Sequence, residues 1–125
     1  MVDQAIVGAA PAAPTEEATL HWLHQRLTAL ANLALMLWLI VSLALLPGYD
    51  KLTLVTWLAQ PKAAIPMILL IVSTFYHARL GLQVIAEDYE KGEARVVTAV
   101  VLNFATILLA TVAIFSILKV AFTGA

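Results

Sequence analysis

The sequence contains no cysteine and very little charge. Without cysteine, the chain itself cannot form disulfides, thiolate nucleophiles, cysteine zinc sites or iron–sulfur ligation. Any electron-carrying cofactor would need histidine or methionine ligands, and the chain has only three residues of each type. Charged residues make up 12% of the sequence and the formal net charge is −1. Because this leaves no basic surface to neutralise phosphates, nucleic acid is not an expected partner.

Apolar residues, in contrast, are abundant. They make up 62% of the 125 residues, and the mean hydropathy is +0.94. A soluble domain of this size could not keep so much apolar surface away from water, so the class is integral membrane protein. Once the spans are subtracted, too few residues remain for a soluble catalytic domain. We therefore expect one subunit of a larger assembly, not an enzyme by itself.

Three apolar runs are each long enough to cross a bilayer. They cover about residues 27–46, 63–85 and 96–118. At ~1.5 Å per residue, about 20 helical residues span the ~30 Å hydrocarbon core. Short connections leave neighbouring helices antiparallel. The predicted fold is all-α, with three transmembrane helices running up, down and up in a single membrane-anchor domain over residues 1–125.

The N-terminal region predicts a tail followed by a helix start at the membrane surface. Residues 1–14 are rich in Ala and Pro and lack the basic and apolar regions of a secretory signal. Thr15 is suited to cap a helix whose first turn contains Glu16 and Glu17, where carboxylates favour the helix dipole. Residues 21–26 (HWLHQR) are typical of an interfacial belt.

Individual residues in the loops and spans predict further local structure. A short surface helix is expected around Leu52–Ala59, and Pro66 is acceptable in the first turn of the second span. Gly92 is available for the backbone reversal before the third span. Asn32 and Ser42 interrupt the first span, and for both we favour hydrogen bonding between helices.

The second span contains most of the unusual chemistry. His77 and Arg79 lie inside an apolar run, where ionisable groups are costly and usually functional. On a helix His77 shares a face with Gly81 and Asp88. A glycine there would leave room for a flat cofactor beside the imidazole, and bis-histidine haem is the natural redox centre without cysteine. The alternative is that His77 bonds a neighbouring helix and Gly81 permits close helix packing.

The remaining candidates need partners outside the second span. His21 and His24 lie at the membrane surface, so a second haem ligand would have to come from another subunit. Arg79 points away from the histidine face, and a subunit contact is favoured over a haem propionate. Asp88 and Tyr89 lie where the helix leaves the membrane. From chemistry alone Tyr89 is an interfacial anchor, although its phenol could also donate a hydrogen bond to a quinone.

Three motifs together resemble a known family. Residues 24–29 (HQRLTA), residues 77–84 (HARLGLQV) and the pair Asp88-Tyr89 are similar to the hydrophobic D subunit of bacterial succinate dehydrogenase, or complex II. The resemblance covers nearly the whole chain. It implies a membrane anchor that pairs with a second, cytochrome b anchor subunit beneath the flavoprotein and iron–sulfur subunits. The two anchors would share one haem b and a ubiquinone site, and electrons would pass through them to the quinone.

The resemblance also implies roles for individual residues. His77 would be an axial ligand of the haem iron, Tyr89 would hydrogen-bond ubiquinone, and Asp88 would support it by pairing with an arginine of the partner anchor. Arg26 would lie near the haem propionates. The N-terminus would be cytoplasmic in a multi-pass protein of the bacterial inner membrane. Charge alone leaves orientation undecided, since three basic residues flank the spans on each side: Arg26, Lys91 and Arg95 against Lys51, Lys62 and Lys119.

Two rival functions compete with this expectation. The first is a purely structural anchor of another membrane complex, without haem. The second is a small transporter or ion-pathway subunit in which His77 and Arg79 form a relay.

Overall fold

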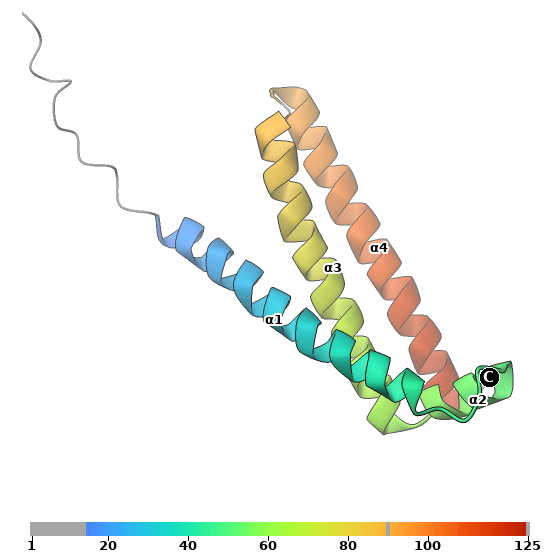
Figure 1. The fold of residues 1–125 in the computed structure, drawn as a ribbon. Coiled ribbons are helices and arrows are strands. Elements are labelled where there is room, and N and C mark those ends of the chain that lie inside the picture. The colour runs from blue at the N-terminus through green and yellow to red at the C-terminus, as the bar shows by residue number, and fades with distance from the viewer. Residues whose placement is uncertain (1–14, 90, 125) are drawn as a thin grey trace, which may run out of the picture.

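The computed structural model describes residues 15–89 and 91–124, apart from the side chain of Tyr89, and over these residues the fold is entirely helical. Four helices follow one another: α1 (Glu16–Ala44), α2 (Lys51–Leu58), α3 (Pro61–Tyr89) and α4 (Glu93–Thr123) (Figure 1). Three of them, α1, α3 and α4, are long and apolar enough to cross a membrane. The predicted all-α, three-span fold is confirmed. The predicted tail, residues 1–14, lies outside the described residues.

Side-chain caps define where the first two helices begin. The Thr15 hydroxyl accepts a hydrogen bond from the backbone N–H of Ala18 at 3.3 Å, which confirms the predicted cap of α1. Asp50 caps α2, where its carboxylate accepts from the Thr53 hydroxyl at 2.6 Å and from the Thr53 N–H at 3.1 Å. These hydrogen bonds, the hydroxyl's first, lower the pKa of Asp50. The short helix expected in this loop is thus present as α2.

The long helices extend beyond the predicted spans. α1 continues without a break from the predicted interfacial segment into the first apolar run, and α3 begins at Pro61. Pro66 therefore lies inside α3, not in its first turn as the sequence suggested. A proline there lacks the N–H that would bond the carbonyl of Lys62. Gly92 adopts a φ of +69° directly before α4, which confirms its role in the backbone reversal.

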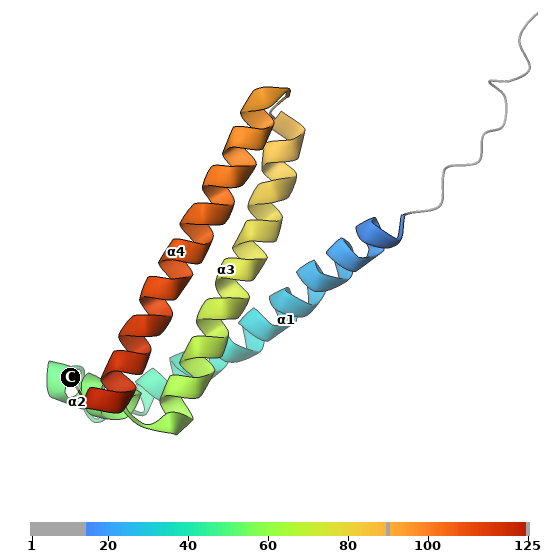
Figure 2. The ribbon, with the colours of Figure 1, turned by 180° about the vertical axis from the view of Figure 1, so that it is seen from behind.

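The three long helices are arranged around α3. In Figures 1 and 2, α3 and α4 run side by side as an antiparallel pair, while α1 crosses α3 and diverges from it. Over the described residues α3 packs against both α1 and α4, whereas α1 and α4 do not contact each other. α2 packs against α3 and α4 at the end where α3 begins.

Very little of this chain is buried within itself. The buried side chains of the described region are all apolar, and all but Ile117 belong to α3: Ala63, Ala64, Leu70, Leu80, Ala86 and Ile117. Large apolar side chains such as Phe104 and Phe115 are about two-thirds exposed. Such a surface requires lipid or a protein partner as its environment.

Candidate functional site

His77 lies on the face of α3 that packs against α1. Its half-buried ring places Nδ1 2.9 Å from the hydroxyl oxygen of Thr28. That hydroxyl also lies 2.8 Å from the carbonyl oxygen of His24 and 3.2 Å from that of Gln25. One turn before His77, the Ser73 hydroxyl donates to the carbonyl oxygen of Thr28 at 3.4 Å. The imidazole is thus tied to one point on α1.

Further polar contacts extend this interface along the two helices. The Tyr76 hydroxyl lies 3.3 Å from Nδ1 of His24, with the two rings edge to face. The Thr74 hydroxyl donates to the side-chain oxygen of Asn32 at 3.4 Å, which confirms the helix–helix hydrogen bond predicted for Asn32. For Ser42 the corresponding bond stays a prediction. Its side chain lines a cavity beside α2 instead.

Gly81 faces a side chain of α1. A Cβ atom at this position would lie 3.7 Å from the side-chain nitrogen of Gln25, an ordinary van der Waals distance. The side-chain oxygen of Gln25 is buried and has no hydrogen-bond partner among the described residues. The packing of α1 on α3 therefore leaves room for a methyl group at position 81, and a role of Gly81 in haem packing stays a prediction.

Arg79 faces α4, away from the histidine. It lines a cavity of about 160 Å³ between α3 and α4. The other polar side chains around this cavity are Gln83, Glu87, Arg95 and Asn103. Within it the Glu87 carboxylate accepts a hydrogen bond from Gln83 at 3.0 Å and lies 3.6 Å from the Arg95 guanidinium. Two residues correspond to about 200° around a helix, so His77 and Arg79 serve different interfaces, as the sequence indicated.

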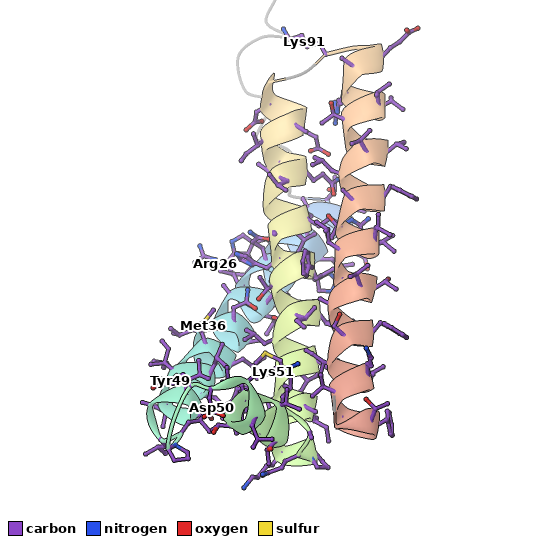
Figure 3. The ribbon with its side chains drawn as sticks, turned by 90° about the vertical axis from the view of Figure 1, so that its right-hand side faces the viewer. Arg26, Met36, Tyr49, Asp50, Lys51 and Lys91 are labelled. Atoms are coloured by element: carbon purple, nitrogen blue, oxygen red, sulfur yellow. The ribbon has the colours of Figure 1, made fainter. Side chains whose placement is uncertain are left out.

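The charged residues near the membrane surface are less enclosed. The Arg26 guanidinium lies over the Trp22 ring, 5.4 Å from its centroid. In Figure 3 Arg26 lies on the side of α1 away from α4. Asp88 is exposed at the end of α3. The side chain of Tyr89 lies outside the described part of the chain, so its hydrogen bond to ubiquinone stays a prediction.

A second, larger cavity lies at the opposite end of the molecule. It has a volume of about 700 Å³, is open to the outside, and lies between the end of α1, the loop and α2. Trp38 and Trp57 stack beside it with centroids 6.1 Å apart and an interplanar angle of 21°. The pairing with Trp38 depends on how α2 folds back, which no local pattern reveals.

The chain is similar to proteins of a known family. Residues 12–118 match the model of the succinate dehydrogenase/fumarate reductase transmembrane subunit family. The chain belongs to this family. The match covers all four helices almost to the end of α4, so the resemblance seen in the sequence motifs is confirmed.

Curated relatives of this succinate dehydrogenase/fumarate reductase family agree. The chain is 36% identical over 69 residues to the succinate dehydrogenase hydrophobic membrane anchor subunit of Rickettsia bellii, over 55% of each chain. It is 33% identical over 70 residues to the subunit of the same name from Rickettsia conorii, over 55% of this chain and 56% of the relative. The aligned part thus spans about half the length of these relatives. No solved structure matches the chain.

The donor chemistry at His77 fits the haem b that the sequence predicts. No group of three or more His, Asp or Glu able to hold a metal ion exists in the described part of the chain. A haem shared by two chains needs only one histidine from each chain as an iron ligand. His77 meets this requirement, because only its Nδ1 is hydrogen-bonded among the described residues. Sequence reasoning missed Thr28, although it lies within the quoted HQRLTA segment.

Proposed function

We propose that this chain is the hydrophobic membrane anchor subunit of a succinate:quinone oxidoreductase in a bacterial inner membrane, with its N-terminus in the cytoplasm. The observation that carries the proposal is the family match over residues 12–118, together with a single half-buried histidine in the central span. The partners are a flavoprotein subunit, an iron–sulfur subunit and a second, cytochrome b anchor subunit. The exposed apolar faces of α1 and α4 supply surface for that second anchor and for lipid.

His77 is the proposed axial ligand of haem b, and the partner anchor supplies the other ligand. The imidazole lies near the middle of α3 and is tied to α1 through Nδ1, so Nε2 is the nitrogen left for iron. When bound, the haem supplies one-electron redox chemistry. This chain contributes the ligand, the apolar surroundings and the ring orientation. Arg26, exposed at the outer part of α1, is the candidate for a propionate contact.

The proposed ubiquinone site lies at the C-terminal end of α3. Tyr89 donates a hydrogen bond to a quinone carbonyl oxygen, and the exposed Asp88 supports it by pairing with an arginine of the partner anchor. Twelve residues separate Tyr89 from His77, which corresponds to ~18 Å along the helix. For Arg79 the cavity shared with Glu87 favours a role inside this chain over a propionate or partner contact.

Purification through an affinity tag on this chain tests the proposal. A flavoprotein and an iron–sulfur protein should co-purify, and succinate should reduce a b-type haem in a reduced-minus-oxidised spectrum. His77→Ala should remove or shift the b band, while His21→Ala, a histidine at the membrane surface, should leave it unchanged. A complex that contains the soluble subunits but no b band would support the haem-free anchor. The absence of both soluble subunits would support the transporter.

A further inference from the structure

The Thr28 hydroxyl has a single proton to share among three neighbours. Two of these neighbours, the carbonyl oxygens of His24 and Gln25, can only accept hydrogen bonds. The contact to His24 is the shorter, at 2.8 Å, and joins residues one turn apart, as is common for threonine in a helix. The hydroxyl proton is therefore directed to the backbone of α1, and the lone pairs of the oxygen remain available.

The third neighbour, Nδ1 of His77, must then be the donor. It lies 2.9 Å from the Thr28 oxygen, and with the hydroxyl proton already used only an Nδ1–H can complete this bond. A neutral imidazole carries one proton, so Nε2 keeps its lone pair. The result is a directed chain in which His77 donates to Thr28 and Thr28 donates to the carbonyl of His24.

A second contact holds the same residues in register. The Ser73 hydroxyl, one turn before His77 on α3, donates to the backbone carbonyl of Thr28 at 3.4 Å. Thr28 is thus engaged through both its side chain and its backbone. Sliding or rotating α3 would break both bonds, so the orientation of the imidazole is coupled to the crossing of α1 and α3.

We propose that Thr28 is a positioning residue that selects the Nδ1–H tautomer of His77 and fixes its ring plane, so that Nε2 is presented as the ligating nitrogen. The effect on haem binding rests on the proposed function, whereas the hydrogen bond between Thr28 and His77 does not. Histidine ligands commonly donate their second ring N–H to an oxygen acceptor, and losing that acceptor typically costs about 10- to 100-fold in metal affinity.

Matched variants separate the hydroxyl from the size of the side chain. Thr28→Val keeps the branched shape without the hydroxyl, and Thr28→Ser keeps the hydroxyl. In the purified complex, Thr28→Val should lower haem affinity by roughly 10- to 100-fold and shift the ferric haem EPR signal. Thr28→Ser should keep the haem affinity and the EPR signal of the unmodified complex. If Thr28→Val binds haem with unchanged affinity and an unchanged EPR signal, the positioning role is wrong.

A second measurement does not depend on haem. The full-length chain, labelled with ¹⁵N-histidine and placed in lipid nanodiscs without haem, should show His77 with a protonated Nδ1 and an unprotonated Nε2. His77→Gln assigns the resonances, and His21 serves as an internal reference. Thr28→Val should mix the tautomers, and Thr28→Ser should not. Finding Nε2 protonated in the unmodified chain would overturn the inference, whereas haem retained in His77→Ala would overturn only the proposed function.

Discussion

The side-chain nitrogen of Gln25 on α1 lies 3.7 Å from the point that a Cβ atom on Gly81 of α3 would occupy. Gly81 therefore faces a flexible side chain of a neighbouring helix. Since 3.7 Å is an ordinary contact distance, a methyl group fits there without moving the backbone. Alanine at this position therefore tests whether haem, and not the packing of α1, needs the space.

Gly81→Ala should be tolerated and should stabilise α3. Alanine is favoured over glycine in a helix interior by roughly 0.5–1 kcal/mol, so thermal unfolding of the purified complex should shift upward. The b-type spectrum should not change. Gly81→Leu is the contrasting variant, because its longer side chain must displace Gln25. A lost or shifted b band in Gly81→Ala would instead show that haem requires the space above Gly81.

Tyr89→Phe should slow electron transfer to quinone without affecting oxidation of succinate. Losing one hydrogen bond of about 0.5–1.5 kcal/mol corresponds to a roughly 2- to 10-fold fall in kcat/KM for ubiquinone. Activity with an artificial soluble acceptor should remain intact. Tyr49→Phe, at the opposite membrane surface, is the matched control and should change neither activity. Equal losses of both activities in Tyr89→Phe would refute the quinone role.

Glu87→Gln should loosen the junction between α3 and α4. The Glu87 carboxylate joins Gln83 to Arg95, but the Glu87 and Arg95 side chains are 42% and 51% exposed. A pair this exposed contributes less than about 1 kcal/mol, so global stability should change little while amide exchange around Gly92 becomes faster. Glu17→Gln is the control, because it removes a carboxylate from the first turn of α1, away from the α3–α4 junction. A loss of several kcal/mol would show that the assembled complex buries the pair.

The cap of α2 should weaken at low pH. Hydrogen bonds from Thr53 hold the pKa of Asp50 below its ordinary value of 3.8. The cap's contribution is therefore complete above that ordinary value and is lost as the pH falls through the lowered pKa. Amide exchange at Thr53 and Leu54, followed against pH, measures this loss. Asp50→Asn should keep the cap and abolish its pH dependence, and a pH dependence unchanged in that variant would identify another group.

Local chemistry made much of the fold predictable. The three spans follow from uninterrupted apolar runs, and Thr15 and Gly92 act at helix ends through their own side chain or backbone. The opposite directions of His77 and Arg79 follow from helical periodicity alone. Pro66 was misplaced because the start of α3 depends on Gln60, whose carbonyl accepts from the N–H groups of Ala63 and Ala64.

The partners of the central side chains could not be predicted in the same way. That Thr28 meets His77, and that Gln25 meets Gly81, depends on the register in which α1 crosses α3. Both helices offer small and polar residues at several positions, so more than one register would satisfy the sequence pattern. A crossing is fixed only by packing summed over the whole interface.

The packing order of the long helices has a consequence for biosynthesis. α1 leaves the ribosome first, yet among the long helices of the described chain it packs only against α3. α1 must therefore remain in the bilayer as a separate span until α3 has been inserted, which its long apolar run allows. Docking of α3 then brings Thr28 and His77 together, so the histidine acquires its orientation only after two of the three spans have been synthesised.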